Sequence, residues 1–200
     1  MTTRVKTITP PDWAGKPIET ELAGWPVITG FESDIKDATV FLANLSHRPK
    51  ALAHGDDAKA IGDFGPNKLV KTETGFAGAL IDVEAMVVDL FGPGEPNWPE
   101  GNYTDVTDAY ALLALWGPES PAVMQRLVSV DVVRPDLDGP FFLGTSSHGI
   151  FVYIINLKGE TPGYLLACTR SQAENLYQAC IRAGRPLGIK PEGTEAFDLI

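Results

Sequence analysis

A stretch rich in glycine, proline and asparagine interrupts the chain near its middle, at residues 92–102. Proline lacks a backbone donor and glycine favours turns, so this stretch forms neither a helix nor a strand. We therefore predict a linker at 92–102, with one structural unit before it at about 27–91 and a second after it at 103–200.

The two units show the same order of patterns. Strand-like segments at 51–54 and 111–116 are followed by Gly55 and Gly117, then by short helical patterns and finally by long, largely apolar runs at 79–91 and 149–157. Within the second run, residues 149–155 are apolar on both faces, which is typical of a central strand covered on both sides. This repetition predicts an α+β fold made of two copies of one small unit.

Capping signals locate two helices in the second unit. Ser120 is suited to cap a helix that begins at Pro121, and a buried face follows at Val123, Met124 and Leu127. The sequence Ser-Gln-Ala-Glu at 171–174 predicts a capping box, with Gly184 as the left-handed cap at the other end. The buried stripe of this helix is predicted to be Ala173, Leu176, Tyr177, Cys180 and Ile181.

The first 26 residues combine four prolines with Trp13 and Trp25 and show no regular period. We predict an extended N-terminal arm over 1–26. Its tryptophans are expected to lie either on the core of this chain or on another subunit, because aromatic anchors dominate interface energetics.

Charge and length limit the classes of function. The chain has 200 residues, 44% of them apolar, and a net charge of -10, so it can bury a core but carries no basic surface for nucleic acid. A basic protein partner or a cationic substrate remains open. The sequence has no apolar run of the length of a membrane span and no signal-peptide pattern, which predicts a cytoplasmic protein with no membrane contact.

Few residues have a pattern suited to catalysis. His47, His54 and His148 lack the spacing of metal ligands, so no metal site is predicted, and Cys168 and Cys180 are interpreted as core residues. No nucleophile elbow or phosphate-binding loop is present. Asp82 lies inside the apolar run 79–83, where it faces either solvent by strand alternation or a partner or cavity.

Four segments together resemble the glycine cleavage T-protein (aminomethyltransferase) superfamily. Residues 103–124 are similar to its "Asp-Val-Ser … Leu-x-Gly-Pro-x-Ala-x-x-Val-Leu" segment, and 45–47 to its "Leu-Ser-His" turn. Residues 156–167 stand in the place of "Arg-Thr-Gly-Tyr-Thr-Gly-Glu-x-Gly-Tyr-Glu", and 188–192 in that of "Gly-Leu-x-Ala-Arg". The resemblance covers about residues 38–200 and is closest to the gamma subunit of heterotetrameric sarcosine oxidase.

The resemblance implies a single T-protein-like, folate-binding-type domain over 27–200, built from two pseudo-repeated ferredoxin-like half-units. It places Asp82 at the family carboxylate that approaches the reacting folate nitrogen, which makes Asp82 the candidate catalytic residue. Leu165 and Glu192 stand where the family holds folate with a glutamate and an arginine. A leucine cannot accept the hydrogen bonds of the pterin, and a glutamate repels the acidic folate tail, so no folate-binding residue is predicted.

Three functions follow from the resemblance. The first is a non-catalytic or vestigial gamma-like subunit of a complex that metabolises methylated amines or other one-carbon donors, partnered by flavin- or folate-carrying chains or by itself. The second is a minimal tetrahydrofolate-dependent aminomethyltransferase that uses Asp82. The third is a folate-sensing protein of iron–sulfur assembly, whose lysine-glycine-cysteine motif is replaced here by Lys158, Gly159 and Glu160.

Overall fold

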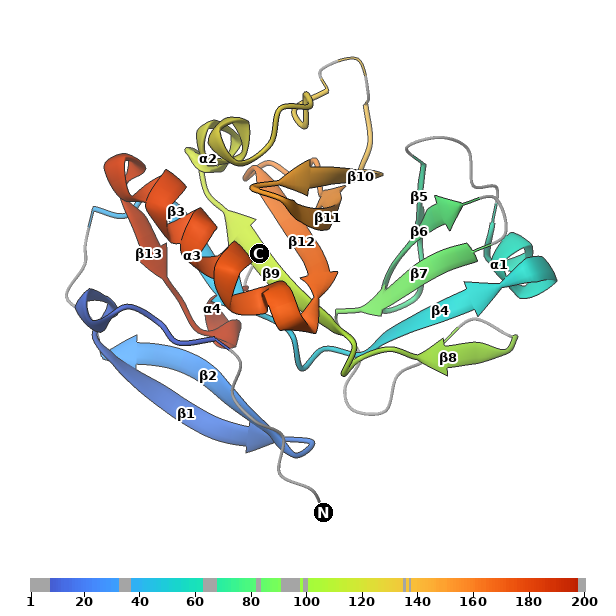
Figure 1. Cartoon of the computed structure of the whole chain (residues 1–200), viewed down its shortest axis with the longest axis horizontal. Coiled ribbons are helices and arrows are strands. Elements are labelled where there is room, and N and C mark those ends of the chain that lie inside the picture. The colour runs from blue at the N-terminus through green and yellow to red at the C-terminus, as the bar shows by residue number, and fades with distance from the viewer. Residues whose placement is uncertain are drawn as a thin grey trace.

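The computed structural model describes residues 8–32, 37–62, 68–81, 84–90, 98, 101–134, 136 and 138–197. These residues form a mixed α+β structure with a six-stranded sheet, a five-stranded sheet and a two-stranded hairpin (Figure 1). The predicted α+β class is therefore confirmed.

The six-stranded sheet forms the centre of the molecule. Its strands lie in the order β10 (Phe141–Ser147), β11 (Ile150–Asn156), β12 (Gly163–Thr169), β9 (Tyr110–Trp116), β3 (Val40–Asn44) and β13 (Ile189–Pro191). Neighbouring strands are antiparallel except β13 and β3, which are parallel. Helices α2 (Ser120–Leu127) and α3 (Ala173–Gly184) cover one face, where alternate strand residues such as Leu113 and Ile154 form the main core (Figure 1).

The five-stranded sheet shares a second core with the central sheet. Its order is β5 (Leu69–Lys71), β6 (Gly75–Ile81), β7 (Glu84–Asp89), β4 (Lys50–His54) and β8 (Tyr103–Asp105), and helix α1 (Gly55–Ile61) follows β4. Met86 and Val88 of β7 pack with Leu112 and Leu165 of the central sheet. Phe142 of β10 lies against Gly78 of β6, where a Cβ atom would come within 2.3 Å of the ring.

Residues 16–32, most of which lie in the expected extended arm, form a hairpin. A short turn, η1 (Asp12–Ala14), precedes β1 (Lys16–Leu22) and β2 (Trp25–Glu32), which pair antiparallel. The sequence did not predict this hairpin, because prolines disfavour strands. Pro17 and Pro26 are tolerated because each occupies only the second position of its strand.

The tryptophans of the N-terminal segment pack on this chain itself. The Arg170 guanidinium lies 4.0 Å from the centre of the Trp25 ring, and that of Arg185 lies 4.8 Å from the Trp13 ring. The backbone of Thr9 is held by α3, since its N–H donates to Glu174 Oε2 at 2.8 Å. Of the two alternatives left open by the sequence, contact with the chain's own core is the one observed.

The helices are where the sequence places them, but three capping predictions are wrong. Val123, Met124 and Leu127 of α2 are buried as predicted, whereas the Ser120 hydroxyl donates to the Pro162 carbonyl at 3.0 Å instead of capping. Ser171 lies in a preceding turn, η2 (Arg170–Gln172), so α3 begins at Ala173 without a side-chain cap. The predicted buried stripe of α3 is confirmed at all five positions.

Gly184 is not a left-handed cap, because its φ of -87° is helical. The helical path continues through η3 (Arg185–Leu187) and ends at Gly188, whose φ is +69°. A Cβ atom on Gly184 would lie 2.7 Å from the Ile189 side chain, so this glycine permits the close approach of β13 to α3.

The apolar run 79–91 is not one strand. It contributes the end of β6 and all of β7, which pair with each other as an antiparallel hairpin. Apolar composition alone did not reveal the reversal of the chain. The run 149–157 does form an interior strand, β11, with Ile154 and Ile155 buried on opposite faces, although Phe151 is exposed.

Cys168 and Cys180 are free, buried thiols, as predicted. Burial raises the pKa of Cys168 to about 11 and that of Cys180 to about 12, so both remain protonated. Within the described ranges no helix has both the length and the apolar content to cross a bilayer. The cytoplasmic location stays a prediction.

Candidate functional site

The "Leu-Ser-His" turn joins the two sheets. Ser46 follows β3, donates its hydroxyl hydrogen to Asn44 Oδ1 at 2.6 Å and accepts the N–H of Leu112 at 3.1 Å. Burial, reinforced by the charges of Arg48 and Lys50, lowers the pKa of His47 to about 3. His47 is therefore neutral, and the Ser46 hydroxyl both donates and accepts a hydrogen bond within the protein. We interpret this turn as a structural connection between the two sheets.

Lys50 is a fully buried amine that the sequence patterns did not single out. Its Nζ donates to the carbonyls of Ser46 at 2.9 Å and Arg48 at 2.7 Å. Burial, followed by the charge of Arg170, lowers the pKa of Lys50 to about 7. The position at the start of an apolar strand was the only available signal, and it does not reveal burial.

Leu165 lies in the middle of β12, between two layers. It has no exposed surface and packs with Leu112 and Ala114 of the same sheet and Met86 of the other. No ligand atom can reach this side chain unless the core opens.

Glu192 lies just after β13, against the N-terminal segment. Its carboxylate pairs with the Lys190 ammonium at 2.5 Å, and its N–H donates to the Leu42 carbonyl at 2.9 Å. It borders a cavity of about 20 Å³, together with Ile8, Pro10, Pro26, Ile28, Phe31, Asn44 and Tyr177. Such a cavity has room for about one water molecule.

Asp82 lies outside the described residues, between the end of β6 and the start of β7. Its role stays a prediction. Glu84 is the first residue of β7, and its Oε2 atom lies 3.2 Å from His54 Nδ1. The structure therefore pairs a histidine with the acidic residue two positions after Asp82 in the sequence, a pairing that strand alternation alone did not predict.

His148 lies apart from the other two histidines. It occupies a left-handed turn position with φ of +50°, and its Nδ1 is 3.3 Å from the Ser147 hydroxyl. It lines an open depression of about 380 Å³ at the C-terminal end of α2, with Arg126 among the other residues. In the part of the chain that the structure describes, no three His, Cys, Asp or Glu side chains gather to hold a metal.

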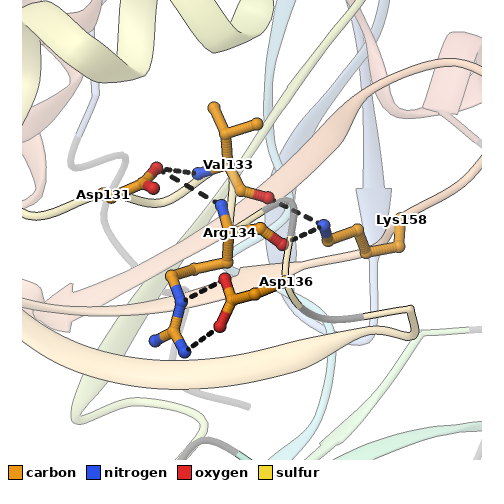
Figure 2. Close-up of polar contacts among 5 residues, drawn as sticks. All are labelled: Asp131, Val133, Arg134, Asp136 and Lys158. Carbon is orange, nitrogen blue, oxygen red and sulfur yellow. Dashed lines mark hydrogen bonds and ion pairs between the residues drawn. The ribbon is translucent and has the colours of Figure 1, made fainter.

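A second lysine fastens the loop before β10. Figure 2 shows Lys158 Nζ donating to the carbonyls of Val133 and Arg134, each at 2.7 Å. Arg134 in turn makes a two-point ion pair with Asp136, at 2.9 and 2.8 Å. The pairing with Arg134 lowers the pKa of Asp136 to about 2. Lys158 and Arg134 both have a positive φ, which is uncommon for residues other than glycine. Because their side chains fix the backbone of the loop, we call Lys158, Val133, Arg134 and Asp136 the clamp.

Leu165 and Glu192, the residues that the sequence resemblance assigns to the folate-binding positions, do not fit folate. Leu165 is apolar and enclosed, and the Glu192 carboxylate is both of the wrong charge and already paired with Lys190. We therefore derive no chemical step through this cofactor.

Comparison with known proteins agrees with this architecture. The model of the GCVT N-terminal domain family matches residues 94–200, which is more than half of the chain. An aminomethyltransferase of Flavobacterium psychrophilum is 32% identical over 98 residues, which cover 48% of this chain and 27% of that protein. A probable aminomethyltransferase of Aeropyrum pernix is 26% identical, over 87% of this chain and 56% of that protein.

Two further similarities are to sarcosine oxidases. The alpha subunit of the Rhizobium meliloti enzyme is 29% identical over 112 residues, covering 52% of this chain and 11% of that subunit. A chain of heterotetrameric sarcosine oxidase from Corynebacterium sp. U-96, solved with pyrrole 2-carboxylate, has a similar fold. Its TM-score is 0.62 at 16% identity, over 74% of this chain and 85% of the other.

The chain matches from 11% to 56% of the length of these curated relatives. The family match nevertheless includes both helices of the covering layer, α2 and α3, and every strand of the central sheet except β3. The predicted T-protein-like fold is confirmed, and the chain belongs to the GCVT N-terminal domain family, within the aminomethyltransferase superfamily and close to sarcosine oxidase.

Proposed function

We propose that this chain is an accessory, non-catalytic subunit of a complex that metabolises methylated amines or other one-carbon donors, and that it binds no tetrahydrofolate itself. The burial of Leu165 carries this proposal, because the family glutamate at this place must reach the ligand. The pairing of Glu192 with Lys190 at the second folate position supports it.

The proposed role as a subunit draws support from the fold similarity to a sarcosine oxidase chain. The overlap with the Corynebacterium chain covers 74% of this chain and 85% of that one. That chain is part of a heterotetramer. The proposed partners are flavin- or folate-carrying chains. The expected equivalent of this chain in sarcosine oxidase is the gamma subunit.

Calorimetric titration of the purified chain with tetrahydrofolate tests the absence of cofactor binding. We expect no saturable heat, whereas a full-length aminomethyltransferase run in parallel should bind. Tight binding by the isolated chain would contradict the proposal.

Affinity purification of the tagged chain from its native host tests the role as a subunit. A flavin- or folate-carrying chain should co-purify in a fixed ratio. A chain that elutes alone, at the mass of one or two copies, would contradict this part of the proposal.

The relatives named as aminomethyltransferases favour one alternative, a minimal tetrahydrofolate-dependent aminomethyltransferase that uses Asp82. In that case Asp82→Asn would abolish transfer of the one-carbon unit while leaving the fold intact. Wild-type protein without any such activity, alone or in its complex, removes this alternative.

A further inference from the structure

Three aromatic side chains gather on the central sheet where the second sheet does not bury them. They are Tyr110 on β9 and Phe151 and Tyr153 on β11, and we call them the aromatic platform. Phe151 is 57% exposed, which is unusual for a phenylalanine, and both tyrosines are half-buried. The Tyr153 ring centre lies 5.0 Å from that of Phe151 and 6.3 Å from that of Tyr110.

Residues of the neighbouring strand β10 hold the rings of the platform in place. Tyr153 stacks on the buried Phe142 ring, with ring centres 5.6 Å apart. Gly144 on the neighbouring strand leaves space for Phe151, since a Cβ atom there would lie 2.9 Å from Cζ of that ring. Fixed rings lose little conformational freedom on binding, which favours their use as interface anchors.

One acidic residue acts electrostatically on the two tyrosines of the platform. The pKa of Tyr110 is raised first by desolvation and then by the charge of Glu84, and that of Tyr153 by desolvation, by Tyr110 and then by Glu84. His54 fixes its orientation through the contact of 3.2 Å. An aromatic face next to a carboxylate attracts a cation, by the ring quadrupole and by ordinary charge attraction.

Phe151 is exposed and both tyrosines are only half-buried, so the platform can contact a bound group from one side only. The rest of the binding site must come from the molecule that carries this group. A basic side chain on a folded partner meets this requirement, and it also complements the net charge of -10. We propose that Tyr110, Phe151, Tyr153 and Glu84 form the docking surface for an arginine or lysine of a partner subunit. This inference rests on the proposed role of the chain in a complex.

Site-specific photo-cross-linking tests the surface directly. In the full chain, expressed in its native host, Phe151 is replaced by p-benzoylphenylalanine and cross-linked peptides are identified by mass spectrometry. We expect a cross-link to a segment of a different chain that contains arginine or lysine. Ile18, 49% exposed on the β1–β2 hairpin, receives the same probe as a control and should not cross-link to that segment.

The outcomes separate the two proposals. A complex that forms without a cross-link from Phe151, or with one only from Ile18, overturns the docking surface and leaves the subunit role intact. A cross-link to a second copy of this chain, or to a segment without basic residues, also overturns the docking surface. If no complex exists, both proposals fail.

Affinity measurements on the purified complex test the role of the carboxylate. Glu84→Gln should raise the dissociation constant about tenfold and make it less sensitive to salt, because one charge pair is lost. Glu160→Gln makes the same change at an exposed position beyond the other end of β11 and should leave affinity unchanged. Equal affinity for both variants would overturn the assignment of Glu84.

Discussion

At the scale of single residues, Leu165 carries the proposal that this chain binds no tetrahydrofolate. Leu165→Glu introduces the residue type that the sequence resemblance implies for this position, but it places a carboxylate in a packed apolar core. We expect a loss of about 4 kcal/mol or more in the free energy of unfolding and no gain of folate binding.

Denaturant unfolding and calorimetry with tetrahydrofolate measure the two effects. Leu165→Met, which keeps volume and polarity, is the control and should cost less than about 1.5 kcal/mol. Folate binding by a stably folded Leu165→Glu variant would show that the site is only one substitution from function, against our proposal.

Lys50 predicts a pH dependence of stability. Its pKa falls from 10.5 in the unfolded chain to about 7 in the folded one, so between these values the unfolded state binds more protons. The stabilisation by Lys50 should therefore rise as pH increases from about 7 towards 10, and stay constant below that range.

The measurement compares the wild type with Lys50→Met across this pH range. At pH 7 the variant should be less stable by ~1–3 kcal/mol, because two buried carbonyls lose their donor, and the difference should widen at higher pH. Lys59→Met, at an exposed position on α1, should show no such trend. A difference that narrows with rising pH would contradict the prediction.

Residue patterns predicted burial well where a helix sets the period. The stripe from Ala173 to Ile181 is an example, because one face of α3 meets the sheet. They failed for Lys50, because its burial depends on carbonyls of a turn that no local pattern specifies. Asp82 was selected for its apolar neighbours, and its role stays a prediction.

At the scale of elements, the β1–β2 hairpin depends on one glycine of the C-terminal segment. A Cβ atom on Gly193 would lie 1.9 Å from the backbone carbon of Thr29, so β2 and the turn before α4 (Thr194–Phe197) are in direct backbone contact. Gly193→Ala should push the hairpin away and reduce stability by about 2 kcal/mol.

Hydrogen exchange of the β2 amides reports this displacement, and exchange should accelerate there more than in β9. Gly139→Ala is the matched control, since a Cβ atom at Gly139 meets no atom within 4 Å. Equal exchange in the two variants would mean that the hairpin is held by other contacts.

The clamp at Lys158 gives a second prediction for an element. Lys158→Met removes two donors from the carbonyls of Val133 and Arg134, at a cost of about 1 kcal/mol (Figure 2). Amides 131–134 should exchange faster while those of β12 do not change. Lys71→Met, at an exposed position of β5, serves as the comparison and should affect neither segment.

Elements were predictable where turn signals and hydrophobic runs agree. β9 ends just before Gly117 and α2 begins soon after it, as expected, and the positive φ of Gly117, +114°, explains why glycine is needed there. The β6–β7 hairpin was missed because its strands are both apolar and run together in composition. The β1–β2 hairpin was missed because its prolines disfavour strands in the sequence pattern, whereas tertiary contacts stabilise these strands in the folded chain.

At the scale of the whole molecule, the two larger sheets share one core and should unfold together. Phe142→Ala removes a ring that contacts Gly78 of the five-stranded sheet and Tyr153 of the central one. We expect a loss of about 3–5 kcal/mol, with a single calorimetric transition in both wild type and variant.

Agreement of the calorimetric and van't Hoff enthalpies would support the prediction of a single domain over 27–200. Two resolved transitions would contradict it, and would favour two units that fold separately. The division into half-units at 27–91 and 103–200 stays a prediction, since β3 of the first unit lies in the same sheet as β9 of the second.

The parallel pairing of β13 with β3 has a consequence for biosynthesis. Residues 40–42 find their outer neighbour only when residues 189–191 have been made. Throughout translation of the intervening chain, the edge of β3 remains open to wrong strands, which is a route to aggregation. The protein should therefore depend on chaperones until residues 189–191 have left the ribosome, and translational pauses before that point would lengthen the period in which β3 can mispair.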